Sequence, residues 1–528
     1  MTFAELAAQN QHLEAEIGEL RDALRAREER LDELERKLAW FQRQTFGTKS
    51  EKRTWVDPAI QPSLLADLGV AVPELPDEEE APRAKAKRRK KSRQDTVTEE
   101  GLRFGPDIPV EVIEILPDEL KGPHADDYEV ISFKSTFRLA QRPGSHVVIE
   151  VRRPVIKHKA TGKLKTTPAP PNVLERSVAD VSFLAGMLVD KFGYHLPLYR
   201  QHQRLLANGI QLSRGSLTAL VARSAQLLAP IAQAQLEHIF TSRVLAMDET
   251  HIKAGRMIGK HKMHPGYFWP LYGGADEVSF TFANSRGQQV IQGLLGDHFE
   301  GILLTDGYKV YERHAKTHAG VVHAQCWAHA RRKFHDIKDK EPKATAEALS
   351  LIGVIYEQEA WIRKRKLEGP AKREARQIYC APAVEAFWKW CDHQCHRLDL
   401  TPSHPLTAAL KYAMARREAL EVFLREPDVQ VDTNHLERSL RPIPMGRRNW
   451  LFCWTEVGAE YVATIQSLLV TCRLQGVDPY TYLVDVLQRV GSHPAREVAD
   501  LTPRRWKALF AGDPLRSVID KRPAVPTP

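Results

Sequence analysis

The first forty residues of the chain place apolar side chains at a period of seven. Between residues 3 and 41, ten of the twelve positions that a heptad would turn toward a partner helix carry leucine, isoleucine or phenylalanine. Asn10 occupies one of the other two, where a buried amide favours a two-stranded register. The pattern predicts a coiled coil over residues 1–45 that joins the chain into a homodimer or higher oligomer. A single amphipathic helix that packs against its own chain is the alternative.

The next two segments lose this periodicity. Residues 46–100 contain the basic run "RAKAKRRKKSR" at 83–93 and predict a charged, disordered linker. That run would act either as an arm on a polyanion such as DNA or as a solvated tether, and the two roles are compatible. Residues 101–175 alternate apolar and polar side chains in places, most clearly at 109–115 and 146–159, which predicts a small β-rich module.

Residues 176–235 change to a helical pattern. A first helix over Tyr199–Ala207, a break, and a second helix capped by Ser213 give the spacing of a helix-turn-helix. Such a unit lays its second helix in a DNA groove, and a plain helical hairpin is the alternative. The residues placed to face DNA are Arg214, Ser216 and Thr218.

Two short apolar runs farther along each lead to an aspartate. Residues 244–247 (VLAM) precede Asp248, and residues 302–304 (ILL) are followed closely by Asp306. Runs of this length predict buried strands, and the carboxyl ends of such strands are where α/β sheets bind ligands. The two carboxylates are therefore candidates for one site, although 306 − 248 = 58 positions separate them.

The segments between the two aspartates predict a fold. Strands are expected at 266–274 and 278–286, and a helix at 287–299. The resulting order of strand, strand, strand, helix, strand is that of the ribonuclease-H-like fold, whose first and fourth strands are neighbours. We therefore expect a catalytic core in two parts, 240–340 and 428–490, separated by a helical insertion at 341–427 and followed by a C-terminal segment at 491–528.

A third carboxylate is expected from the stretch "DTNHLERSLRPIPMGRRNW", in which Glu437 heads a run of basic residues. Three carboxylates suit a pair of Mg²⁺ ions, for which Mn²⁺ can substitute, in phosphodiester chemistry. Asp428 and Asp432 are rival third ligands, and a surface pair of Glu437 with Arg441 is the alternative role. The basic residues expected to grip phosphates here and upstream are Arg438, Arg441, Arg447, Arg448, His329, Arg331 and Arg332.

Two cysteine–histidine clusters are candidate zinc sites. One is His323, Cys326 and His329; the other is the "CDHQCH" segment at 391–396. Neither offers four well-placed ligands, so we expect core packing instead. Trp450 is expected to close the core rather than to stack on a base.

Composition and charge narrow the class of protein. The chain has 528 residues, a formal net charge of +9, a sequence pI of about 9.1 and six cysteines. The positive net charge is consistent with an anionic partner, and the small number of cysteines is consistent with a reducing compartment. The N-terminus is charged from Glu5 onward, with no signal-peptide pattern, so a cytoplasmic, nucleoid-associated protein without a membrane partner is expected.

At these residues the sequence resembles the insertion-sequence-66 family of bacterial DDE transposases. The resemblance includes "MDET" (247–250), "DGY" (306–308), "CWAHARRKF" (326–334) and "NHLERSLRPIPMGRRNWLF" (434–452). It implies that Asp248, Asp306 and Glu437 form a metal-binding catalytic triad. It further implies hydrolysis at the ends of a mobile element, attack of the freed 3′-hydroxyl on target DNA, and possible accessory proteins.

One departure from that family stands out, because residues 101–175 contain no cysteine. Members usually carry a zinc-binding module there, and no zinc is expected in this chain's cysteine-free counterpart. The predicted fold class is thus multidomain α/β: a ribonuclease-H-like domain with a helical insertion, preceded by coiled coil, β-rich module and helix-turn-helix-like region. A nuclease of the same fold and a non-enzymatic dimeric DNA-binding protein remain alternatives.

Overall fold

The computed structural model describes most residues between 172 and 517 and a few short segments before them. The described residues are 68–69, 96–97, 103–104, 146, 155–157, 164–166, 172–175, 177–208, 210–257, 262–296, 299–450, 453 and 455–517. The predicted coiled coil and most of the linker and β-rich module lie outside them. At the end of the predicted linker, β1 (Thr96–Val97) pairs antiparallel with β2 (Arg103–Phe104) of the module. Within the module, β3 (Val155–Lys157) pairs antiparallel with β4 (Leu164–Thr166).

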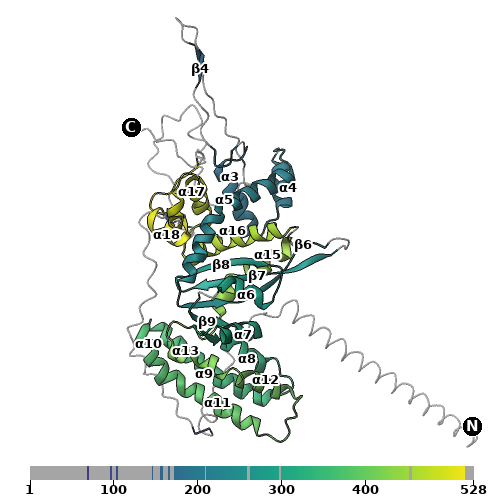
Figure 1. Ribbon diagram of the computed structural model, residues 1–528, viewed down its shortest axis with the longest axis vertical. Helices are drawn as coiled ribbons and strands as arrows, with labels where there is room; N and C mark the ends of the chain where they lie inside the picture. Colours follow the sequence, from purple (N-terminus) through teal and green to yellow (C-terminus); the bar gives the residue numbers. More distant parts are fainter. Residues whose placement is uncertain are drawn as a thin grey trace, which may run out of the picture.

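Six strands form the central mixed sheet (Figure 1). From one edge, β10 and β9 run parallel, β9 runs parallel to β5, and β5 runs antiparallel to β7, which also pairs antiparallel with β6 and β8. The first strand of the sheet is thus the neighbour of the strand that precedes Asp306, as the sequence predicted. The strands are β5 (Val244–Met247), β6 (Thr250–Arg256), β7 (Met263–Gly273), β8 (Glu277–Ala283), β9 (Gly301–Thr305) and β10 (Val321–Gln325).

Strand β6 was not among the strands predicted from the sequence, and the reason lies in the composition of β6. Ala246 pairs with Tyr272 and Thr250 pairs with Phe268, so β5 and the first part of β6 follow β7 in one register, which shifts between Lys253 and Arg256. They are one bent strand that is interrupted only at residues 248–249. Its second half turns few apolar side chains inward, mainly Ile252, and therefore lacks the apolar run that identified the first half.

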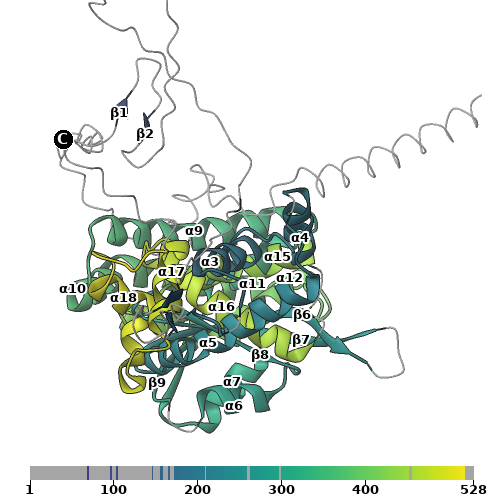
Figure 2. The same ribbon diagram turned by 90° about the horizontal axis from the view of Figure 1, so that it is seen from above.

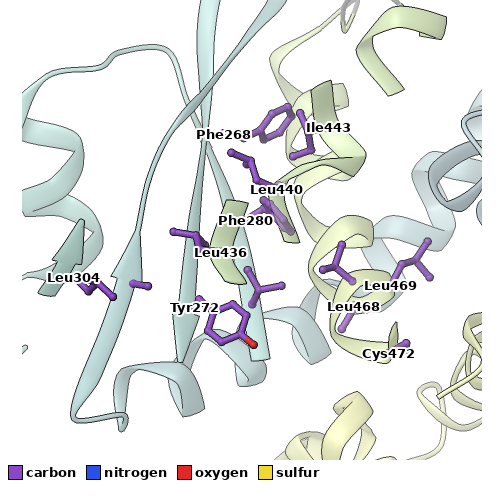
Figure 3. Packing of buried hydrophobic residues seen from close by; sticks show 14 of the residues in the cluster. Phe268, Tyr272, Phe280, Leu304, Leu436, Leu440, Ile443, Leu468, Leu469 and Cys472 are labelled. Atoms are coloured by element: carbon purple, nitrogen blue, oxygen red, sulfur yellow. The ribbon is translucent and has the colours of Figure 1, made fainter. Parts of the chain in front are cut away.

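The two faces of the sheet are covered by different helices, because strand residues alternate between them. One face packs against α14 (Asn434–Leu440) and α16 (Glu456–Leu474), and Figure 3 shows Leu304, Phe280 and Leu436 among the residues of this cluster. The other face packs against α6 (Gln288–Leu295) and α7 (Lys309–Thr317), which Figure 2 shows on the side of the sheet away from α16. Both faces of the sheet therefore contribute to the hydrophobic core.

The N-terminal helices pack on the same core. They are α3 (Val181–Leu188), the π-helical turn η3 (Val189–Gly193), α4 (Leu198–Ala207) and α5 (Arg214–Phe240). Ser213 caps α5 by accepting a hydrogen bond from the Ser216 N–H, as predicted. The helix then extends past the predicted hairpin, and the buried Gln235 donates to the Val278 and Ser467 carbonyls. This hydrogen bonding joins α5 to β8 and α16.

The segment between β10 and α14 is helical throughout, as predicted for the insertion. Its described helices are α8 (Trp327–His335), α9 (Pro342–Lys364), α10 (Gly369–Ala375), η4 (Arg376–Cys380), α11 (Ala381–Cys395), α12 (Pro405–Met414) and α13 (Arg417–Arg425). The buried Arg376 pairs with Glu359 at 2.7 Å and donates to the Phe423 carbonyl at the end of α13. In Figure 1 these helices lie on the opposite side of the sheet from α3 and α17.

The chain returns to the sheet after the insertion and ends in a helical segment. The elements are α14 (Asn434–Leu440), α15 (Pro442–Trp450), α16 (Glu456–Leu474), α17 (Pro479–Arg489), η5 (Ala495–Leu501) and α18 (Pro503–Leu509). Cys453, between α15 and α16, exchanges backbone hydrogen bonds with β6 at Lys253 and Gly255. Among the helices described, none is both long and apolar enough to cross a bilayer.

Candidate active site

Asp248 and Asp306 occupy matching positions at the ends of neighbouring parallel strands. Ala246 of β5 pairs with Leu304 of β9, and each aspartate follows two residues later. Neighbouring strands lie roughly 4.8 Å apart, and side chains two residues apart share a face. Both carboxylates are therefore expected on the face of Ala246 and Leu304, which is the face that α14 covers.

The surroundings of Asp248 disfavour its charged form. Burial is the main cause, and it raises the pKa of this carboxyl to about 7, although the Glu249 N–H donates to Oδ1 at 2.8 Å. The charges of Glu249 and Asp306 add to the rise, which places both carboxylates close by. A bound divalent ion would stabilise the ionised form of such a group.

Glu437 lies on α14, one turn from its start, and its ion partner in the described part of the chain is His329. The Nε2 atom of His329 lies 3.9 Å from Oε1 of Glu437. His329 also acts on Asp248, whose pKa it lowers. One imidazole is thus near both a strand-end aspartate and the helical glutamate, which brings the three predicted residues into one region.

The β10–α8 junction holds the segment that leads into α14. The Thr433 N–H and hydroxyl both donate to the buried sulfur of Cys326 at 3.3 Å, and the Trp327 N–H donates to the Val431 carbonyl at 3.1 Å. These contacts span more than a hundred positions of sequence. They set the start of α14, and with it Glu437, against the strand that lies beside Asp306.

The rival third ligands have other roles. Asp428 is largely exposed and pairs with Arg243 at 3.6 Å. Asp432 accepts a hydrogen bond from the Asn434 N–H and so supports the start of α14. Within the described residues no ion pair joins Glu437 to Arg441. Glu437 therefore remains the best-placed third carboxylate.

A fourth carboxylate, Glu249, was missed by the sequence analysis. Its side chain is only 3% exposed; it accepts a hydrogen bond from the Tyr311 hydroxyl at 2.6 Å and from Arg286 Nε at 2.7 Å. Arg286 in turn lies 4.1 Å from the ring centre of Tyr308, whose N–H donates to Asp306 Oδ1 at 2.9 Å. A chain of contacts thus connects the residue after Asp248 to the loop after Asp306. No local sequence pattern links these positions.

The helical insertion also reaches the Asp306 loop. Arg416 donates to the Gly307 carbonyl at 3.0 Å and lies 4.0 Å from the ring centre of Tyr412. A Cβ added at Gly307 would lie 2.0 Å from the Tyr412 hydroxyl oxygen, so this approach requires glycine. The insertion therefore supports the turn that presents Asp306.

The predicted phosphate-binding residues differ in exposure. Arg438, Arg441, Arg448, Arg332, Arg214 and Thr218 are exposed, whereas His329, Arg447 and Ser216 are half-buried. Arg447 donates to the His251 carbonyl, which fixes α15 against β6. Arg331 is only 9% exposed, so the structure places it on the buried face of α8 and not toward DNA. The half-buried Trp450 packs against the core, as expected.

Neither zinc alternative gains support. His323 lies on β10 and hydrogen bonds to Thr305, whereas Cys326 precedes α8, so the cluster does not share one helix face. Burial raises the pKa of Cys326 to about 11, which keeps it a thiol and not a thiolate ligand. On α11, Cys391 is buried and Cys395 exposed.

Three metal-ligand atoms within 4.8 Å of one another occur in the described residues only at His493, Glu497 and Asp500, far along the chain from the candidate site. Asp500 there is already paired with Arg505 at 2.5 Å. The three predicted carboxylates are therefore more widely spread than a single-ion site. A pair of ions roughly 4 Å apart would accommodate such a spread.

Comparison with known proteins adds sequence relationships to this geometry. Residues 176–461, just over half of the chain, match the family model described as "Transposase IS66 family", and residues 467–504 match "IS66 C-terminal element". Residues 33–113 match "Transposase C of IS166 homeodomain". All three matches fall in chain order.

Curated relatives come from Sinorhizobium fredii (strain NBRC 101917 / NGR234). Uncharacterized protein y4hP is 30% identical over 399 residues, which cover 71% of each chain. Uncharacterized protein y4jD is 32% identical over 366 residues, covering 65% of this chain and 70% of its own. Uncharacterized protein y4qI is 29% identical over 386 residues, covering 70% of each.

Proposed function

The chain belongs to the transposase IS66 family, a group of DDE transposases, and on that premise we propose that Asp248, Asp306 and Glu437 are its catalytic, metal-binding carboxylates. The reaction would be metal-dependent hydrolysis of a phosphodiester at the ends of an insertion sequence, followed by strand transfer into target DNA. The observation that carries the proposal is the parallel register of β5 and β9, which ends both strands in an aspartate at the same sheet edge.

The topology of the sheet supports a ribonuclease-H-like catalytic domain. When β5 and β6 are counted as one bent strand, the five strands follow the order third, second, first, fourth, fifth across the sheet. The second strand alone runs antiparallel to both of its neighbours, while the first, fourth and fifth are parallel. Within this order, the neighbouring first and fourth strands were predicted from the sequence, and helices occupy the segment between the fifth strand and Glu437.

The donor set fits a hard divalent cation. Three carboxylates supply only oxygen ligands, and Mg²⁺ prefers such ligands, with Mn²⁺ as a substitute. Burial and the charges of Glu249 and Asp306 raise the pKa of Asp248, and a bound cation would favour its ionised form. When bound, a pair of such ions supplies an activated oxygen nucleophile and stabilises the leaving oxygen.

The protein groups would hold and orient the DNA strand. Asp248, Asp306 and Glu437 would together hold the ions through their carboxylate oxygens. The exposed Arg438 and Arg441 follow Glu437 on the same helix and would bind phosphates next to the scissile bond. Because this catalysis is mainly positioning and electrostatics, small displacements of the carboxylates should be costly.

The partners proposed are double-stranded DNA at the element ends and at the target, and a second copy of the chain. Arg214, Ser216 and Thr218 at the start of α5 would contact DNA outside the active site. The dimer contact would be the coiled coil predicted from the heptads of residues 1–45. Accessory proteins of the element are further candidate partners.

The test uses the purified full chain, Mg²⁺ and a duplex oligonucleotide that carries the element end. The parent protein should nick the end and, with target DNA present, join the 3′-end to it. Asp248→Asn, Asp306→Asn and Glu437→Gln should each reduce both products at least a hundredfold. An end-binding assay in EDTA controls for folding, since all three variants should bind like the parent. Cleavage by Asp248→Asn at the parental rate would overturn the proposed triad.

A nuclease of the same fold would cut in this assay without joining, so the strand-transfer product separates the two activities. A purely DNA-binding protein would bind the end and yield no Mg²⁺-dependent product.

A further inference from the structure

A groove of about 850 Å³ lies beside the candidate active site, where the N-terminal helices meet α14, α15 and α17. One wall is the turn at Tyr194 and His195 that follows η3. The rest of the lining includes Arg438, Arg441 and Met445, together with Arg473 and Tyr480. The groove thus joins the helical N-terminal region to the helix that bears Glu437.

The charge of the groove is positive. Among the described residues no carboxylate pairs with Arg438 or Arg441, and Arg473 donates to the Gly193 carbonyl at 3.0 Å, which holds the turn in place. Two carboxylates also line the groove, but both are engaged. Asp190 pairs with Arg204 at 2.5 Å, and Asp478 caps α17 by accepting from the Thr481 N–H. Guanidinium groups with no acidic partner suit phosphate oxygens.

The groove also presents aromatic and apolar surface to solvent. Tyr194 is 74% exposed and Met445 is 54% exposed, which is unusual for large apolar side chains. The adjacent His195 has a left-handed backbone, with φ of 59°, and its buried Nδ1 atom has no hydrogen-bond partner among the described residues. Strained backbone and an unpaired buried polar atom are both typical of ligand sites.

The groove lies one helical turn from the third carboxylate. Arg441 follows Glu437 by four positions, and residues at this spacing are neighbours about 6 Å apart on a helix surface. Arg441 lines the groove, and the Glu437 carboxylate lies near His329 of α8. A DNA strand bound at the three carboxylates would therefore reach the groove within about one or two nucleotides.

We propose that this groove binds an unpaired, single-stranded stretch of DNA next to the cleaved phosphodiester. Its phosphates would lie on Arg438 and Arg441, and one base would stack on Tyr194 beside His195. The inference rests on the proposed function and adds a substrate feature: the strand separates locally before or during cleavage.

Size and chemistry favour a single strand over a duplex. Cavities of roughly 300–1,000 Å³ hold molecules of drug size, which is the scale of a nucleotide or two. The faces of duplex bases are covered by stacking, so an exposed tyrosine ring can stack only on a base that has left the helix. A positive groove with an aromatic platform is the arrangement that binds single strands without sequence preference.

The test measures equilibrium binding of the full chain to fluorescein-labelled single-stranded dT20 and to a dT20·dA20 duplex, both in EDTA. Because no metal or cleavage is involved, a wrong triad would leave this result unchanged. Tyr194→Ala should weaken dT20 binding about tenfold or more, as expected for loss of one stacked base. Arg438→Gln with Arg441→Gln should do the same and lower the salt dependence of dT20 binding.

Matched variants make the result specific. Tyr194→Phe keeps the ring and should bind dT20 within twofold of the parent. Tyr199→Ala removes the exposed tyrosine of α4, which does not line the groove, and should also stay within twofold for dT20. Duplex affinity should change less than twofold in Tyr194→Ala.

Ultraviolet cross-linking of a bromodeoxyuridine-substituted dT20 locates the strand. The cross-linked peptide should contain Tyr194 or Tyr480. The proposal is overturned if the parent does not bind dT20, if Tyr194→Ala and the double arginine variant bind it like the parent, or if dT20 and duplex binding fall equally. Circular dichroism and thermal melting identify any variant that has lost its fold, and the arginine variants then provide the second, independent measure.

Discussion

The Nε2 atom of His329 lies 3.9 Å from the Oε1 atom of Glu437, and the same imidazole lowers the pKa of Asp248. His329 belongs to α8, which follows directly on β10 at the edge of the sheet. Its ring therefore lies near both Glu437 of α14 and Asp248 at the end of β5. This relationship predicts that His329 positions the third carboxylate.

His329→Ala should weaken catalysis without abolishing it. Partners that orient metal-binding carboxylates typically contribute about 10- to 100-fold in metal affinity or activity. The half-maximal Mg²⁺ concentration for end cleavage should rise, and saturating Mg²⁺ should restore part of the rate. Arg332→Ala, an exposed neighbour on the same helix, should instead weaken DNA binding and leave the Mg²⁺ midpoint in place. An unchanged midpoint in His329→Ala would argue against the positioning role.

Glu249 should support the site through Arg286 and Tyr311 without binding metal directly. Tyr311→Phe removes a hydroxyl that donates to this buried carboxylate at 2.6 Å. A hydrogen bond to a charged group is worth about 1.5–3 kcal/mol, so thermal unfolding should occur at lower temperature and cleavage should slow.

Glu312→Gln is the matched control for this prediction. Glu312 lies on the same helix, α7, and pairs with Lys316 in an i,i+4 ion pair at the surface. Surface pairs of this kind contribute only about 0.3–0.5 kcal/mol. If Tyr311→Phe melts and cleaves like Glu312→Gln, the buried network has no role in holding the site.

Gly307→Ala should distort the Asp306 loop because the new methyl group would overlap the Tyr412 side chain. Overpacking of this kind costs about 1–3 kcal/mol, and the loss should appear in both stability and cleavage rate. The double variant Gly307→Ala, Tyr412→Ala should recover much of the stability of Tyr412→Ala alone. Gly293→Ala, at a helical site with open space around it, should be neutral or slightly stabilising. Additive losses in the double variant would contradict this contact.

The six cysteines should differ sharply in reactivity. Cys395 is exposed, whereas Cys326, Cys380, Cys391, Cys453 and Cys472 are buried. Burial raises the pKa of Cys326 and Cys453 to about 11, which suppresses their reactive thiolates. Native protein treated with an aromatic disulfide reagent should release one equivalent of thiolate quickly, and Cys395→Ser should remove it. Rapid release of two or more equivalents would show that the core around α8 and α11 opens.

Short apolar runs predicted the strands that carry the site. The residues before Asp248 and Asp306 are apolar because both faces of their strands are covered, and such runs are visible without an alignment. The pairing of β5 with β9 followed from the order of elements alone. Glu437 was predicted as the third carboxylate because it heads a run of basic residues, and the structure places it in the short helix α14.

Other features depend on contacts that have no local pattern. The hydrogen bond from Arg416 to the carbonyl of Gly307, the residue after Asp306, joins positions that lie 109 apart. The hydrogen bond from Thr433 to Cys326 joins positions that lie 107 apart. In contrast, the burial of Arg331 had a visible signal. Trp327, Ala330 and Phe334 define a buried helical face at i, i+3 and i+7, and Arg331 falls on that face at i+4.

The most direct test of the central claim is anomalous X-ray diffraction from crystals of the full chain soaked in Mn²⁺. The proposed triad predicts two strong anomalous peaks about 4 Å apart, both within bonding distance of carboxylate oxygens of Asp248, Asp306 and Glu437. Asp248→Asn crystals should lose at least one of them. Manganese bound only at His493, Glu497 and Asp500, with no peak between β5, β9 and α14, would contradict it.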